Sequence, residues 1–158
     1  MKSILDSVEK FLGLFVSVLI GAMMLWTFAL VITRYCFNFT PSYGEELARY
    51  MFVWVVFLSL PIVAKKGAHM AIEMITIRLK GRALKTLRLI SGTLTLIFLV
   101  LMVYQGSLLV LKSSIQTSAA LQIPMSWVYI AIPVGCLIML VNVLGDFLTL
   151  LRTPADQL

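Results

Sequence analysis

Charged residues are scarce in this chain. Only 13% of the 158 residues are charged, 61% are hydrophobic, and the mean hydropathy is +1.01. Soluble domains carry about 25% charged and about 45–50% apolar residues. Because a soluble fold of this length could not bury so much apolar surface, the composition predicts one domain, residues 1–158, that is dissolved in lipid.

Histidine and cysteine are scarcer still. His69 is the one histidine, and the two cysteines, Cys36 and Cys136, belong to no C-x-x-C pair. A haem-carrying four-helix subunit would need two histidine ligands, and a quinone-linked disulfide oxidase would need reactive cysteine pairs. The sequence also has no phosphate-binding glycine loop and no metal-ligand spacing. We therefore expect no enzymatic activity and no cofactor or metal.

Long apolar runs make up most of the chain. Phe11–Thr33 and Leu89–Leu111 are 23 residues each without a charge, and Trp127–Gly145 is 19. A membrane-spanning helix needs about 20 apolar residues. Tyr50–Ala64 has only 15 uncharged residues and reaches spanning length only if its helix begins near Tyr43. The sequence thus predicts an all-α integral membrane protein with four spans, at about 11–33, 43–64, 86–111 and 124–151.

The basic residues predict the orientation. Seven of the 13 lysines and arginines lie between the second and third spans. Since lysine and arginine collect in short cytoplasmic loops, we expect both termini in the cytoplasm and two short loops outside. A nucleic-acid partner is not expected, because these residues lie between membrane spans.

The same basic segment has helical spacing of apolar residues at Ile72, Ile75 and Leu79. This pattern predicts a short amphipathic helix in the membrane interface, at about residues 70–80. Basic residues on both sides are expected to bind anionic phospholipid headgroups: Lys65, Lys66, Arg78, Arg82, Lys85 and Arg88. The alternative is a docking face for a cytoplasmic partner.

No carboxylate is predicted at the middle of the membrane. Glu45 and Glu46 fall at the outer mouth of the second span, and Asp146 falls at the cytoplasmic end of the fourth. A small proton-coupled exporter needs an ionisable group at membrane depth. This distribution argues against a transporter that works alone.

The outer mouth of the second span is rich in polar residues. Ser42-x-x-Glu45 has the pattern of a capping box. Glu45 and Glu46 precede Arg49 by four and three residues, so either carboxylate is expected to pair with the guanidinium, and Arg34 lies at the same membrane face. Two interpretations stay open: a capped helix with internal ion pairs, or a polar cluster that faces a second protein.

Small residues recur along the first span at Gly13, Ser17 and Gly21. Such a stripe lets another helix approach closely, either inside the chain or from a partner. Trp54 is a further candidate for helix packing or a partner interface.

Five segments closely resemble the small membrane subunit (DctQ type) of tripartite ATP-independent periplasmic (TRAP) transporters: Arg34–Asn38, Glu45–Trp54, Ala64–Glu73, Ala120–Trp127 and Ile132–Gly135. They occur in the family's order, and the resemblance extends over nearly the whole chain.

The resemblance implies a multi-pass subunit of a bacterial inner membrane and a division of labour. A large multi-span subunit would hold the substrate and sodium sites and move as an elevator. A soluble periplasmic protein would deliver an organic acid such as sialic acid or a C4-dicarboxylate. The small subunit would stabilise and anchor the static scaffold and contribute to docking outside. The alternatives are a free-standing small transporter and a membrane anchor of another complex.

Overall fold

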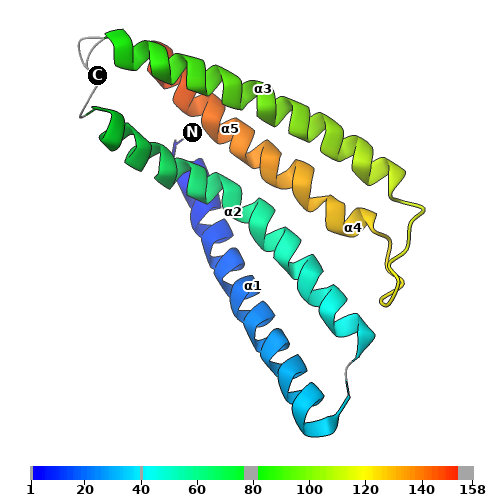
Figure 1. The fold of residues 1–158 in the computed structure, drawn as a ribbon. Helices are drawn as coiled ribbons and strands as arrows, with labels where there is room; N and C mark the ends of the chain where they lie inside the picture. The colour runs from blue at the N-terminus through cyan, green and yellow to red at the C-terminus, as the bar shows by residue number, and fades with distance from the viewer. Residues whose placement is uncertain (1, 40, 77–81, 153–158) are drawn as a thin grey trace.

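The computed structural model describes residues 2–39, 41–76 and 82–152, with side chains for residues 10–39, 41–65 and 83–151. Its helices are α1 (Lys2–Phe37), α2 (Ser42–Thr76), α3 (Arg82–Lys112), α4 (Ser126–Tyr129) and α5 (Ala131–Arg152) (Figure 1). Four stretches are long and apolar enough to cross a membrane: Lys10–Phe37, Ser42–Lys65, Ala83–Lys112 and Ser126–Leu151. The predicted all-α membrane fold with four spans is confirmed.

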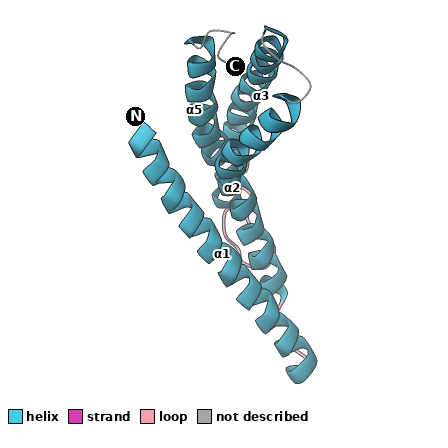
Figure 2. Ribbon diagram, turned by 90° about the vertical axis from the view of Figure 1, so that its left-hand side faces the viewer, coloured by secondary structure: helices cyan, strands magenta, loops and turns pink. Residues whose placement is uncertain are grey.

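The four long helices form an open layer in the order α1, α2, α5, α3. Helix α2 packs against α1 on one side and α5 on the other, and α5 packs in turn against α3. Figure 1 shows α1 and α3 at opposite edges of this arrangement, and Figure 2 shows α1 running alongside α2 and apart from α3 and α5. Each edge helix therefore has one principal neighbour and keeps most of its circumference free.

The contact between α1 and the rest of the chain is narrow. Leu12 and Val16 of α1 are buried against Leu58 of α2, and Trp54 and Ile138 pack around them. Only 6% of the apolar stretch of α1 is buried, compared with 22% for α2. The exposed surface of α1 thus consists mostly of apolar side chains that face lipid or another protein.

Helices α2 and α5 approach each other closely at Gly135. A side chain there would collide with the backbone carbonyl of Phe57, whose carbon lies 2.7 Å from the position of a Cβ atom. Pro61, itself fully buried, has no amide hydrogen to offer the Phe57 carbonyl one turn earlier. The α5 backbone at Gly135 therefore packs directly against a carbonyl oxygen that lacks its usual amide donor four residues later in α2.

The last span is interrupted for a similar reason. Pro133 cannot donate to the carbonyl of Tyr129, and α4 and α5 are separated at Ile130. Ile130 nevertheless keeps helical angles, with φ −61° and ψ −23°, and its carbonyl accepts from the Val134 amide at 3.2 Å. The two pieces form one span.

Helix α2 continues beyond its membrane stretch. It is unbroken from Ser42 to Thr76, so the first part of the predicted interfacial segment, residues 70–76, is helical as an extension of α2. Residues 77–80 of that prediction lie outside the described residues. The placement of this segment in the membrane interface stays a prediction.

We expect Gly135→Ala to destabilise the protein by about 1–3 kcal/mol, because the backbone carbonyl of Phe57 cannot rotate away from an added methyl group. Thermal unfolding in detergent, followed by size-exclusion chromatography, measures this change. Gly145→Ala is the matched control on the same helix, since no atom lies within 4 Å of the added Cβ. Equal melting temperatures for the two variants would contradict the proposed close approach.

Candidate functional site

The loop between α3 and α4 folds back on itself as a hairpin, residues 116–125. The Ser118 amide donates to the Ile123 carbonyl at 2.9 Å, and the Met125 amide donates to the Gln116 carbonyl at 2.8 Å. Gln122 reverses the chain with a positive φ of 55°. The hairpin tip, residues 119–122, thereby directs backbone amides toward the start of α2.

Glu46 of α2 binds this tip. Its Oε2 atom accepts hydrogen bonds from the amides of Ala120 at 2.9 Å and Leu121 at 3.0 Å, and its Oε1 atom accepts from the Tyr50 hydroxyl. The Ser118 hydroxyl accepts a further bond from the Leu121 amide at 3.1 Å. We call these five residues the outer latch.

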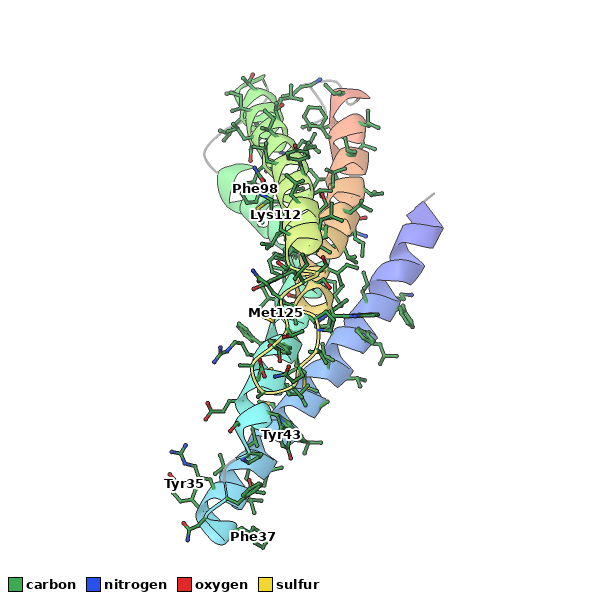
Figure 3. All side chains as sticks on the ribbon, turned by 90° about the vertical axis from the view of Figure 1, so that its right-hand side faces the viewer. Tyr35, Phe37, Tyr43, Phe98, Lys112 and Met125 are labelled. Atoms are coloured by element: carbon green, nitrogen blue, oxygen red, sulfur yellow. The ribbon has the colours of Figure 1, made fainter. Side chains whose placement is uncertain are left out.

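The outer latch joins distant parts of the chain. Tyr50 and Ser118 are only 7% and 3% exposed, and the Sδ atom of Met125 lies 3.3 Å from the Tyr50 hydroxyl. Figure 3 shows Met125 on the loop where it runs past α2. Adjacent amides at a turn form a small anion-binding concavity, and a carboxylate makes stronger bonds to them than a neutral acceptor does. The latch thus fixes the hairpin on α2.

A second contact fixes α2 on α1 at the same end. The Trp26 indole donates to the Gly44 carbonyl at 3.0 Å. A side chain at position 44 would collide with Leu30 of α1. Gly44 therefore lets the start of α2 lie directly on α1. Sequence reasoning missed this role, although a glycine in a first helical turn was a usable signal.

Aromatic side chains surround the connection between α1 and α2. Tyr35, Phe37 and Phe39 are 79%, 73% and 60% exposed. Figure 3 shows Tyr35 and Phe37 projecting at the end of the molecule, with Tyr43 nearby. Exposed aromatic rings are typical of the level where lipid tails meet headgroups.

The predicted ion pair between Arg49 and Glu45 or Glu46 is wrong. Both oxygens of Glu46 are already bound within the outer latch, Oε2 by the Ala120 and Leu121 amides and Oε1 by the Tyr50 hydroxyl. Arg34, Glu45 and Arg49 are exposed, and they make no ion pair or hydrogen bond within the part of the chain that the structure describes. The spacing of three and four residues made the pair possible, but the amides of the hairpin bind the carboxylate instead.

The capping box is also absent among the described residues. Ser42 is already the first helical residue, and its hydroxyl makes no hydrogen bond there. The Pro41 carbonyl instead accepts the Gly44 amide at 2.9 Å.

The small-residue stripe of α1 does not pack inside the chain. No described atom comes within 4 Å of a Cβ placed on Gly13 or Gly21. Ser17 is exposed and bonds the Gly13 carbonyl of its own helix at 2.8 Å. Among the described residues the stripe therefore has no packing partner, and its role in helix packing or a partner interface stays a prediction. Trp54, in contrast, packs against the cluster of Leu12, Val16 and Leu58.

The residues predicted to bind lipid headgroups are only partly described. Lys65, Lys85 and Arg88 are partly buried, and the Arg88 Nε atom is buried without a hydrogen-bond partner among the described residues. The side chains of Lys66, Arg78 and Arg82 lie outside them. Headgroup binding stays a prediction. The described residues also contain no cluster of three histidine, cysteine or acidic side chains that could hold a metal ion.

We expect Glu46→Gln to release the hairpin tip, because an amide side chain replaces one acceptor oxygen with a donor and removes the charge. Hydrogen exchange at the Ala120 and Leu121 amides should accelerate roughly tenfold or more. Tyr50→Phe should have a smaller effect, since it leaves Oε2 bound to both amides. Glu45→Gln, one residue away on an exposed carboxylate, is the control. Unchanged exchange in Glu46→Gln would refute the latch.

Known proteins resemble this chain over most of its length. The family model for the DctQ component of tripartite ATP-independent periplasmic transporters matches residues 9–153. A TRAP transporter small permease protein of Haemophilus influenzae is 27% identical over 97 residues, which is 61% of this chain and 60% of the relative. The C4-dicarboxylate TRAP transporter small permease protein DctQ of Vibrio cholerae is 32% identical over 97 residues, 61% of this chain and 40% of the relative.

A third relative is longer. The isethionate TRAP transporter permease protein DctMQ of Oleidesulfovibrio alaskensis is 31% identical over 105 residues, 65% of this chain but only 16% of the relative. The matched segment thus spans 60% or less of each of these three proteins. With four membrane-spanning helices and a family match over 9–153, the chain belongs to the DctQ family, the small permease subunits of TRAP transporters, and is a multi-pass protein of the inner membrane.

Proposed function

We propose that this chain is a non-catalytic scaffold subunit of a sodium-coupled secondary transporter that imports an organic acid. In this proposal a large elevator-type membrane subunit holds the substrate and the sodium ions. The present chain stabilises and anchors the static part of that subunit. The substrate class is an acid such as a C4-dicarboxylate or sialic acid; two relatives carry C4-dicarboxylate and isethionate in their names.

The open helix layer is the observation that carries the proposal. Only 6% of the apolar stretch of α1 and 11% of that of α3 are buried, so both edge helices lack a neighbour on most of their surface. A transporter that moved substrate by itself would need a closed path lined by polar or ionisable groups. Further membrane helices placed against the edges would extend the layer into a larger scaffold.

The acidic residues support a role without ion coupling. The sequence has no carboxylate between Phe11 and Thr33, Tyr50 and Ala64, or Leu89 and Leu111. At the outer mouth, the Glu46 carboxylate is used to hold the hairpin. Ion coupling would then belong to the partner subunit.

The hairpin is our proposed contribution to the outer docking surface for the substrate-binding protein. The outer latch fixes its tip, and Ile115 beside it is 90% exposed. A rigid loop loses less conformational freedom on binding than a mobile one.

Co-expression with the large subunit and reconstitution in liposomes test the proposed function. The two chains should co-purify, and together with the binding protein they should accumulate the acid under a sodium gradient. This chain alone should give no uptake. Sodium-driven uptake by this chain alone would overturn the scaffold role and favour the free-standing transporter. Co-purification with an unrelated membrane enzyme would favour an anchor of another complex.

Arg49→Ala is expected to weaken association of the two membrane subunits by roughly two- to fivefold, the range of an exposed charge interaction. Arg49 is exposed at the outer mouth and pairs with no described residue of its own chain, so its charge is available to a partner. Arg49→Lys, which keeps the charge, is the control. Binding is measured by co-purification and substrate preference by competition in the uptake assay. A changed substrate preference would contradict a purely structural role for this residue.

A further inference from the structure

Helix α3 has one long exposed face that continues toward its outer end. Leu94, Phe98 and Leu101 are 62%, 59% and 55% exposed, and Gln105 is exposed one turn further along. Their spacing of four, three and four residues places them on one side of the helix. Phe98 is visible on this edge helix in Figure 3.

Gln105 differs from the other small polar side chains of α3. The hydroxyls of Thr93, Thr95 and Ser107 each bond a carbonyl of their own helix at 2.8–2.9 Å. The Gln105 carboxamide makes no hydrogen bond to any described residue. Its two donors and its acceptor oxygen therefore need partners from outside the described part of the chain.

The position of Gln105 limits what those partners can be. It lies seven residues before Lys112, which is about 10 Å along a helix, and Leu108, Leu109, Val110 and Leu111 lie between. Placing an amide in hydrocarbon without a hydrogen-bond partner costs free energy. Lipid tails have no hydrogen-bonding groups, and we place the lipid ester and headgroup oxygens near Lys112, beyond these four aliphatic residues. A polar group on a neighbouring membrane helix can reach this depth.

The surface beside Gln105 fits such a helix. A shallow apolar groove between α3 and α5 is lined by Leu96, Ile97, Val100, Leu101, Leu140 and Leu144. Ile97 and Leu101 lie two turns and one turn below Gln105 on the same row of side chains. The groove can accept apolar side chains of a helix whose polar group meets the carboxamide one turn above.

We propose that Gln105 hydrogen-bonds a polar group on a transmembrane helix of the large subunit, and that this helix lies along the exposed α3 face of Leu94, Phe98, Leu101 and Gln105. This inference rests on the proposed function, which supplies the large subunit, and it deepens that function by assigning α3 as a contact edge. A single interhelical hydrogen bond in a membrane contributes little binding free energy. The amide therefore fixes the orientation of the partner helix and supplies only a small part of the affinity.

A competition assay tests the assignment. Gln105→Leu with a small epitope tag and wild-type chain without it are co-expressed with a limiting amount of the large subunit. The large subunit carries a different tag, through which the complex is purified. The ratio of the two small chains in the purified complex is then measured. Loss of one interhelical hydrogen bond should reduce the relative affinity of Gln105→Leu about three- to tenfold. Gln105→Asn should recover part of it. Because leucine is more apolar than glutamine, insertion of the variant in the membrane should not suffer.

Ser107→Ala is the matched control, because its hydroxyl is bound within α3 and the residue lies about 200° around the helix from Gln105. It should compete equally with wild type. If wild type and Gln105→Leu enter the complex equally, the carboxamide faces lipid or solvent and the α3 assignment fails while the scaffold role stands. If the wild-type chain does not co-purify with the large subunit at all, the proposed function itself fails.

Discussion

The structure depends on one constraint: in hydrocarbon, each backbone and side-chain polar group needs a partner inside the protein. The prolines of α2 and α5 create the hardest cases. Pro61 leaves the Phe57 carbonyl without its helical donor, and Gly135 brings the α5 backbone directly against that carbonyl. A residue without a side chain is required there, because only a backbone can come so close. This contact is one point at which α2 and α5 pack tightly at the centre of the layer.

The same requirement acts through the latch at the end of the helices that carries the hairpin. A hairpin tip exposes amides that have no partner in their own turn, and Glu46 supplies two oxygens to Ala120, Leu121 and Tyr50. The carboxylate therefore joins α2 to a loop that belongs to α3 and α4. Trp26 joins α1 to the start of α2 through the Gly44 carbonyl. These two contacts connect all parts of the outer end although the helix layer itself is open.

The four spans could be predicted from the sequence because uninterrupted apolar runs are a property of single segments. The contacts of Glu46 could not be predicted from the sequence. Its predicted partner, Arg49, is three residues away, whereas its actual partner Ala120 is separated by 74 residues. Side-chain spacing reports only neighbours on one helix. The order of the helices in the layer could not be predicted from the sequence either. In lipid the buried and exposed faces of a helix are both apolar, so no amphipathic pattern marks the side on which α2 meets α5. Gly13 and Gly21 illustrate this, since their stripe faces away from the chain.

The two edges of the layer differ in chemistry, and this difference bears on what they contact. Along its apolar stretch, the free side of α1 presents small residues and apolar side chains, and the hydroxyls of Ser17 and Thr27 there are bound to carbonyls of their own helix. Lipid tails can therefore cover this part of α1 as well as a protein can. The free side of α3 contains a carboxamide that lipid tails cannot satisfy. Packing against α1 can therefore be loose or exchangeable, whereas α3 requires a defined polar neighbour. In a scaffold subunit with these properties, the contact of α3 would fix how the subunit is oriented relative to the large subunit. Helix α1 would widen the scaffold in the plane of the membrane.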